Sequence, residues 1–361
     1  MAPQTRNIPG FSATAIAFCI LLYAQPQSEF IFTEAPFASA HASTIVELPN
    51  GDLLAAWFGG TAEGKPDVAI WASKKSEGVW SKPQVLAREP NIATYNPVFF
   101  YSRDGRLWLY YKFGPHPTSW TAGRRSSDDD GKTWSPIEHL PAGIYGPIRA
   151  KPLVLNDGTI VSGSSVESYH SWACWIERST DNGRTWKRIG PITVPRPTPV
   201  LPMASLTHAA KRDSFASSDT YGIIQPSVVL LPGGKLRFYA RSTGQIARIC
   251  ISDSDDAGIT WTPARPIDVP NPNSGIDAVS LADGRVVLVY NNTTTGRTPL
   301  NLAVSTDSEH FRMFRTLEDS AGEYSYPALI QASSGDLHLT YTWNRKRIKY
   351  VRIALSEIPR N

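Results

Sequence analysis

Polar side chains recur where short apolar segments of the sequence begin and end. The segment starts carry His41, Asn96, Lys151, Gln225, Asp277 and Tyr326. The ends of the apolar segments that follow carry Lys112, Arg241 and Asn291, and the loops beyond supply Glu63, Asp67, Glu167, Arg297 and Arg345. A buried charge must be paired or used. This set therefore predicts either a structural ion network or a polar cup that binds a ligand.

Basic residues outnumber the acids in this set, and Arg149 adds one more. Arginine binds a carboxylate through two parallel hydrogen bonds. We therefore predict a glycan substrate that carries a carboxylate. The predicted substrate-binding residues are Arg241, Arg297, Lys151, Arg149, Lys112, Asn96, Gln225, Asp277, Asn291 and Tyr326. The net charge of +4 is too small to indicate nucleic-acid binding.

An eight-residue pattern, Ser-x-Asp-x-Gly-x-Thr-Trp, is repeated along the chain. Full copies occupy residues 127–134, 179–186 and 254–261, and worn copies occupy 73–80 and 305–311. Ser and Asp side chains can bond the backbone of a turn, Gly adopts a conformation closed to other residues, and Trp packs beneath. We predict that these Asp-box aspartates stabilise turns and have no catalytic role.

Six hairpin signals, each a Gly turn between two apolar segments, precede the boxes. They lie at residues 50–52, 104–105, 157–158, 233–234, 283–284 and 334–336. No window has helical periodicity, and the repeat length near 50 residues is typical of one blade. We predict an all-β, six-bladed β-propeller with Asp-box turns, occupying residues 28–358 as a single domain. Residues 29–33 are expected to complete the last blade, and residues 194–218 to form an insertion.

The N-terminus has the pattern of a secretory signal peptide. Arg6 precedes an apolar run from Phe11 to Tyr23, and Ala24 provides a small residue at the expected cleavage point. We predict a signal peptide at residues 1–24 and a secreted or periplasmic protein with no stable membrane span after cleavage. If the segment stays uncleaved, it would act as a membrane anchor. Cys174 and Cys250 are expected to be two separate buried thiols.

The chain resembles the sialidase superfamily, in particular the bacterial predicted neuraminidases with BNR repeats. Besides the Asp-boxes, the resemblance rests on short phrases at residues 41–44, 57–60, 146–148, 224–226, 272–278 and 324–327. It covers roughly Phe37 to Ile353. The resemblance implies a propeller fold and exo-glycosidase activity on a terminal acidic sugar, with no cofactor. No metal-binding motif is present.

Catalytic roles follow from the resemblance by position. Tyr324 would be the nucleophile and Glu167 its base, while Arg241 and Arg297 would be two of three arginines that bind the substrate carboxylate. The acid would come from the loop after Gly60, where Asp67 is the candidate and Glu63 the alternative. The third arginine of the family normally opens the first blade, but residues 38–41 of this chain contain none.

A second chemistry fits the same residues. Propeller enzymes of related appearance cleave rhamnose–glucuronate linkages by hydrolysis or elimination. Elimination requires a base beside the carboxylate, and His41 or a tyrosine is suitable, with Arg241 and Lys151 neutralising the carboxylate. A third interpretation is a non-catalytic glycan-binding propeller.

Overall fold

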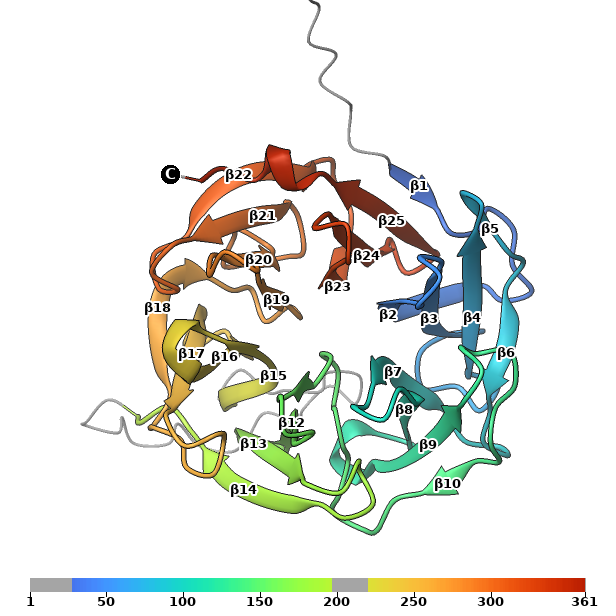
Figure 1. Ribbon diagram of the computed structural model, residues 1–361, viewed down its shortest axis with the longest axis horizontal. Helices are drawn as coiled ribbons and strands as arrows, with labels where there is room; N and C mark the ends of the chain where they lie inside the picture. Colours follow the sequence, from blue (N-terminus) through green and yellow to red (C-terminus); the bar gives the residue numbers. More distant parts are fainter. Residues whose placement is uncertain (1–27, 197–219, 361) are drawn as a thin grey trace, which may run out of the picture.

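The computed structural model describes residues 28–196 and 220–360, which form antiparallel sheets arranged in a ring (Figure 1). This confirms the prediction of an all-β chain. The helical segments in the described residues are three short 3-10 turns: η1 (Pro117–Ser119), η2 (Pro232–Gly234) and η3 (Leu355–Glu357). None of the described helices is long and apolar enough to cross a membrane. The predicted signal peptide and most of the predicted insertion lie outside the described residues.

Two sheets come from the N-terminal part of the chain. The first contains β2 (Ser39–Glu47), β3 (Leu53–Gly60), β4 (Ala69–Ser76), β5 (Val79–Trp80) and β6 (Gln84–Ala87). The second contains β7 (Thr94–Tyr101), β8 (Leu107–Phe113), β9 (Thr121–Ser127) and β10 (Glu138–His139). Each begins with the hairpin that the Gly turns predict.

The middle of the chain forms one eight-stranded sheet. Its strands are β11 (Leu153–Val154), β12 (Ile160–Glu167), β13 (Ser171–Ser179), β14 (Lys187–Ile192), β15 (Tyr221–Leu230), β16 (Leu236–Ser242), β17 (Arg248–Ser254) and β18 (Arg265–Pro270). Antiparallel pairs make up two halves, β11 to β14 and β15 to β18. A short parallel pairing of β13 with β15 joins the halves.

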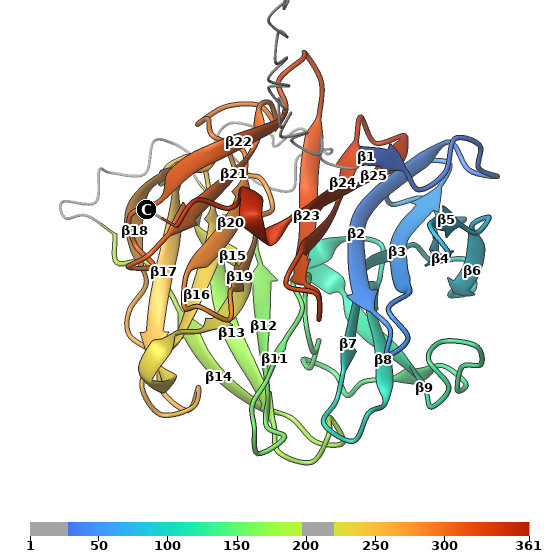
Figure 2. The same ribbon diagram turned by 45° about the horizontal axis from the view of Figure 1, so that its top comes forward.

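The C-terminal part supplies the remaining two sheets. One contains β19 (Asp277–Ser280), β20 (Val286–Tyr290), β21 (Leu300–Ser305) and β22 (Arg312–Glu318). The other contains β23 (Tyr324–Gln331), β24 (Leu337–Trp343), β25 (Arg347–Ile353) and the N-terminal β1 (Ser28–Phe30). The pairing of β1 with β25 agrees with the expected outer strand from the N-terminus. Figures 1 and 2 show β23 beside β2, and the amide of Ala42 donates to Thr342 of β24.

The innermost strands share an irregularity that directs side chains toward the axis. In β2, β7, β15 and β23 the register shifts by a bulge, and one residue of each bulge has a left-handed backbone. These residues are Ala42, Asn96, Gln225 and Tyr326. His41, which the sequence places with Asn96 among the segment starts, lies one residue before the bulge residue Ala42. Ser43 stands where the other three strands have proline, so the sequence carries no marker for the shift.

The Asp-box turns have the structural role that the sequence predicts. In the first box the Ser127 hydroxyl donates to Asp129 and accepts from the Gly131 amide, at 2.8 Å each. Asp129 accepts from the amide and hydroxyl of Thr133, and these bonds lower the pKa of Asp129 to about 2. Ser127 pairs with Leu107, and Phe113 pairs with Thr121. The box therefore lies at the end of the sheet opposite Lys112.

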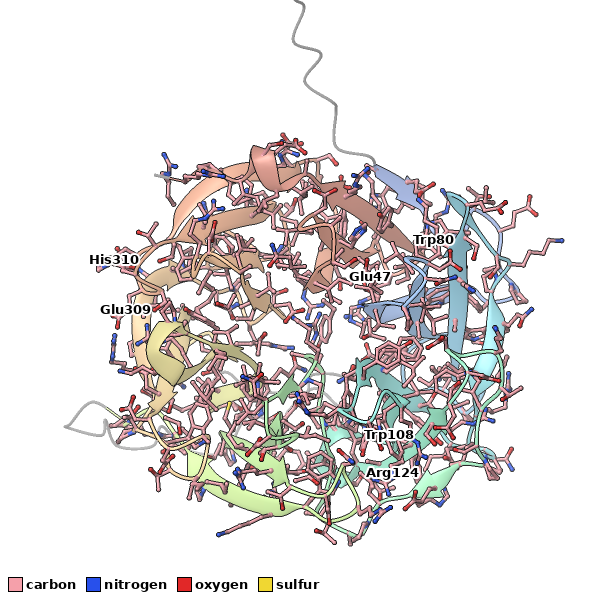
Figure 3. The ribbon with its side chains drawn as sticks, viewed as in Figure 1. Glu47, Trp80, Trp108, Arg124, Glu309 and His310 are labelled. Carbon is pink, nitrogen blue, oxygen red and sulfur yellow. The ribbon has the colours of Figure 1, made fainter. Side chains whose placement is uncertain are left out.

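Arginine side chains bind each sheet to the next box. Arg124 of β9 donates to the carbonyl of Gly183 while its guanidinium lies 5.0 Å from the Trp108 ring (Figure 3). Arg178 donates to the carbonyl of Ala257 at 3.2 Å, and Arg237 donates to that of Ser308 at 3.1 Å. Each arginine thus satisfies a backbone oxygen of the following Asp-box, which links neighbouring sheets or, for Arg178, the two halves of the eight-stranded sheet.

Apolar clusters fill the spaces between sheets. Cys174 and Cys250 lie in the cluster between the two halves of the eight-stranded sheet, together with Ile176, Phe238 and Ala240. Both thiols are buried and free, as predicted. Burial raises the pKa of Cys250 to about 12, so the thiol stays protonated and unreactive.

Removing a box serine tests the structural role. Ser127→Ala leaves the partly buried amide of Gly131 without its acceptor, and we expect the free energy of unfolding to fall by about 1 kcal/mol. Urea titration followed by tryptophan fluorescence measures this. The neighbouring Ser126→Ala is the control and should stay within about 0.5 kcal/mol of wild type. Equal stability of the two variants would contradict the role.

Candidate active site

Tyr326 lies at the centre of a group of arginines. Its hydroxyl accepts from Nη1 of Arg241 at 2.7 Å, and Gln225 lies 3.4 Å away. The guanidinium groups of Arg149, Arg241 and Arg297 lie 5.4, 5.8 and 5.6 Å from the ring centroid. Burial opposes ionisation of the phenol, but the charges of Arg241 and Arg297 outweigh it and lower the pKa of Tyr326. The geometry favours a reactive phenolic oxygen.

A chain of ion pairs borders this group. Arg297 donates to Glu323 at 2.7 Å, Arg345 binds the same carboxylate at 2.9 and 3.0 Å, and Arg345 also contacts Glu63. The two glutamates balance only two of the four arginines, counting Arg149 and Arg241. The centre therefore keeps a positive surplus that suits an anionic ligand.

Glu323 and Arg345 are absent from the set of catalytic and substrate-binding residues that the sequence analysis predicts. Arg345 belongs to the loop set there, and Glu323 directly precedes the Tyr324–Pro327 phrase, so the signal was present. The sequence does not show that these residues contact one another or Glu63, because Glu63 lies 282 positions from Arg345 along the chain.

Glu167 is a half-buried carboxyl at the same centre. Burial raises the pKa of Glu167 to about 7, with Arg241 opposing and Glu63 adding to the shift. Arg241 and Glu63 also affect the pKa of Tyr326. A carboxyl group that titrates near neutral pH can take or give a proton during a reaction. The placement agrees with the role of base, which stays a prediction.

His41 packs against Tyr326, with ring centroids 4.4 Å apart, and against Phe58 at 5.4 Å. It is 1% exposed, and its Nδ1 has no hydrogen-bond partner. Burial, followed by the charges of Arg345 and the other arginines, lowers the pKa of His41 well below its usual value. The imidazole is therefore neutral at pH 7, and the same surroundings disfavour its protonation.

The side chains of Tyr324 and Asp67 bond outside the arginine group, although the Tyr324 amide donates to the carbonyl of Arg297 at 3.0 Å. The Tyr324 hydroxyl bonds Ser320 at 2.7 Å, and its ring belongs to an apolar cluster with Leu339 and Tyr341. Asp67 accepts from the amide and hydroxyl of Thr61, which lower the pKa of the Asp67 carboxyl and favour its charged form. Their catalytic roles stay predictions, but the geometry favours Tyr326 over Tyr324, and the neighbouring Glu63 makes the contact with Arg345.

Five of the predicted binding residues bond within the fold. Lys112 is fully buried and donates to the carbonyl of Pro147 at 2.5 Å, and burial lowers the pKa of Lys112 to about 7. Asn96 donates to Ile148, and Asn291 donates to Pro299 and to the carbonyl of Tyr324. Lys151 pairs with Asp277 at 3.1 Å.

No group of His, Cys, Asp and Glu side chains suited to a metal occurs in residues 28–196 and 220–360. A groove of about 800 Å³ lies between β1 and β5, lined by residues 29–36 and 78–83. None of the predicted site residues lines this groove, and it shares no residue with the arginine group.

A ring of β-sheets with repeated Asp-box turns is the architecture of sialidase-like proteins. The family described as BNR repeat-like domain matches residues 51–339, and the chain belongs to this family. A search of curated proteins found no match.

Solved structures share the fold at low sequence identity. A protein of unknown function from Dyadobacter fermentans is 17% identical, with a TM-score of 0.73, and the match covers 91% of this chain and 98% of that one. A variant of the NanB sialidase from Streptococcus pneumoniae is 14% identical, with a TM-score of 0.69 and coverage of 91% and 71%. An α-L-arabinanase from Penicillium chrysogenum is 16% identical, with a TM-score of 0.68 and coverage of 93% and 100%.

The raised pKa of Glu167 predicts a pH-dependent stability. The folded state holds the proton more tightly than the unfolded state, whose carboxyl has a usual pKa of 4.5. Wild-type stability contributed by this group is therefore present below pH 4.5 and is lost as pH rises through 7. The difference in free energy of unfolding between Glu167→Gln and wild type should therefore shift in favour of the variant by about 1–2 kcal/mol from pH 5 to pH 8, allowing for solvent screening. Denaturant titrations at both pH values measure the difference. A constant difference would contradict the assignment.

Proposed function

We propose that the protein is an exo-glycosidase that acts on a terminal acidic sugar, sialic or uronic acid, with Tyr326 as its nucleophile. The observation that carries the proposal is the contact between the Tyr326 hydroxyl and Arg241, within a group of four arginines. The fold shared with sialidases supports the same class of reaction. Tyr326 takes the role that the sequence resemblance gave to Tyr324.

The charge balance explains why a carboxylate sugar and a tyrosine belong together. The positive surplus attracts the substrate carboxylate, and Arg241 and Arg297 are suitable to bind it. A carboxylate nucleophile would be repelled by such a substrate, whereas a neutral phenol is not. A phenol with a lowered pKa gives up its proton readily as it attacks.

The reaction proceeds by double displacement. The Tyr326 oxygen forms a bond to the anomeric carbon as the bond to the leaving oxygen breaks, and the phenolic proton passes to Glu167. The leaving oxygen takes up a proton from an acid, for which Asp67 stays the sequence-based candidate. Water then attacks the anomeric carbon and gives its proton to the carboxylate left by that acid, while the tyrosyl–sugar bond breaks and Glu167 returns its proton to the Tyr326 oxygen.

The proposal also includes the sequence-based predictions of blade number, substrate class and location. The six hairpin-led units, with the eight-stranded sheet counted as two, support a six-bladed propeller. The substrate is a glycan with a carboxylate, met outside the cytoplasm after the signal peptide is removed. Neither nucleic acid nor a metal takes part.

Elimination is the second candidate, and His41 favours it. Its imidazole is neutral at pH 7 and packs on Tyr326, so the imidazole, or Tyr326 as its phenolate, would take a proton from the carbon beside a uronate carboxylate. The arginines would neutralise that carboxylate. The electrons of the broken C–H bond form a double bond as the glycosidic oxygen departs.

The two tyrosines give a matched test of the nucleophile. Tyr326→Phe removes the oxygen bonded to Arg241 and should lower kcat by about 10³-fold or more, as expected for loss of a nucleophile. Tyr324→Phe removes an oxygen bonded to Ser320 within the core and should retain kcat within about threefold. Steady-state kinetics of wild type and the two variants measure these effects. The reverse order would restore Tyr324 as the nucleophile.

The substrate and reaction type are tested together. Purified protein is incubated with sialosides and with rhamnose-capped glucuronosides in ¹⁸O-labelled water, and products are analysed by mass spectrometry. We expect one ¹⁸O atom in the released sugar. An unsaturated uronate without label would replace hydrolysis by elimination. No reaction with any acidic glycoside would leave binding without catalysis as the better account.

A further inference from the structure

Tyr326 is held in a backbone conformation that its residue type rarely adopts. Its φ is 50°, and the bulge leaves Tyr326 and Pro327 between the paired residues Ser325 and Ala328. An aromatic residue in the left-handed region persists only where its surroundings fix it. Because no β24 residue pairs with Tyr326 or Pro327, other contacts must hold the backbone of Tyr326 in this conformation.

Arg149 provides the first of these contacts. It reaches the axis from the segment before β11 and is 3% exposed. Its guanidinium donates to the carbonyl of Pro327, the residue after Tyr326, and to that of Ile276 at 3.0 Å. The same guanidinium lies 5.4 Å from the Tyr326 ring centroid. Arg149 therefore fixes the bulge on both its backbone and its aromatic side.

Asp277 provides the second contact. Its Oδ2 accepts from the Leu329 amide at 2.8 Å, where β23 resumes after the bulge. Its Oδ1 accepts from Ser227 of β15 at 2.6 Å and from the Ala278 amide at 3.0 Å. Lys151 neutralises Asp277 at 3.1 Å and also donates to the Ala278 carbonyl at 3.0 Å. The carboxylate is 1% exposed and fully occupied by these partners.

We propose that Arg149, Lys151 and Asp277 form an axial network that positions Tyr326 and makes no contact with substrate. The network joins the segment before β11 to β15, β19 and β23, so the orientation of one tyrosine depends on several sheets at once. Its role as a catalytic device rests on the proposed function, but its effect on Tyr326 itself does not. The three residues therefore do not act as the substrate-binding groups that the sequence indicated.

Asp277→Asn separates positioning from simple electrostatics. Removing a negative charge near Tyr326 would by itself favour the phenolate and lower the pKa of Tyr326. If the network positions Tyr326 against Arg241 and Arg297, the same variant lets the ring move away from them, and the pKa rises. The two accounts predict opposite signs.

The titration needs no substrate. Tyrosinate absorbance is followed against pH in wild type and in Tyr326→Phe, and their difference gives the titration of Tyr326 alone. The same difference is measured in the Asp277→Asn and Ser227→Ala backgrounds. We expect the Tyr326 transition to move to higher pH by about one unit in Asp277→Asn. Asp336→Asn is the matched control, because Asp336 also binds one cation, Arg352, and one backbone amide, that of Leu355.

A lower or unchanged Tyr326 transition in a folded Asp277→Asn protein would overturn the proposal. Circular dichroism and thermal unfolding identify a variant that has lost its fold, in which case Ser227→Ala, which removes a donor to Asp277 without changing any charge, should raise the pKa of Tyr326, whereas simple electrostatics predicts no change. Kinetics then provide a second readout: a positioning network lowers kcat about 10²-fold with KM within threefold, whereas substrate contacts would raise KM. If wild type cleaves no acidic glycoside, the proposed function fails, but the titration still tests whether the network positions Tyr326.

Discussion

Repulsion among four arginine side chains is the constraint on which the centre of this molecule depends. Arg149, Arg241 and Arg297 lie around one tyrosine, and Arg345 shares the carboxylate of Glu323 with Arg297. Each charge must be compensated within a largely buried space. Glu323 and Glu63 neutralise part of the charge, while Arg149 is bound by neutral carbonyls. The remaining positive potential acts on Tyr326, whose pKa falls in spite of burial. The same potential would bind a substrate carboxylate.

The rest of the fold brings these groups together and keeps them fixed. Bulges in the inner strands turn single residues, Gln225 and Tyr326 among them, into positions that a regular strand would not provide. At the other end of the sheets, Asp-box turns and the arginines that bind their carbonyls fix neighbouring sheets to one another. The Asp-box turns and the arginine group thus lie at opposite ends of the sheets.

Local features were predictable from the sequence because their physical causes lie within a few residues. The Asp-box bonds of Ser127 and Asp129, the six hairpins and the outer strand supplied by the N-terminus follow from turn chemistry and strand patterning. For the arginine group around Tyr326, the sequence indicated which types of residue gather there but not how they are arranged. Tyr324 and Tyr326 would share a face in a regular strand, and the bulge at Tyr326 separates them. Which cations face solvent, and which bond a carbonyl as Lys112 does, depends on partners far along the chain.

The most direct test of the account is whether this centre recognises a carboxylate. Calorimetric titration of the wild-type protein with sialic acid and with methyl glucuronoside, each compared with its carboxamide, isolates that one charge. The account predicts that at least one acid binds about tenfold or more tightly than its carboxamide, and that Arg241→Ala removes the preference. Equal affinity for both acids and their carboxamides in the wild-type protein would contradict it.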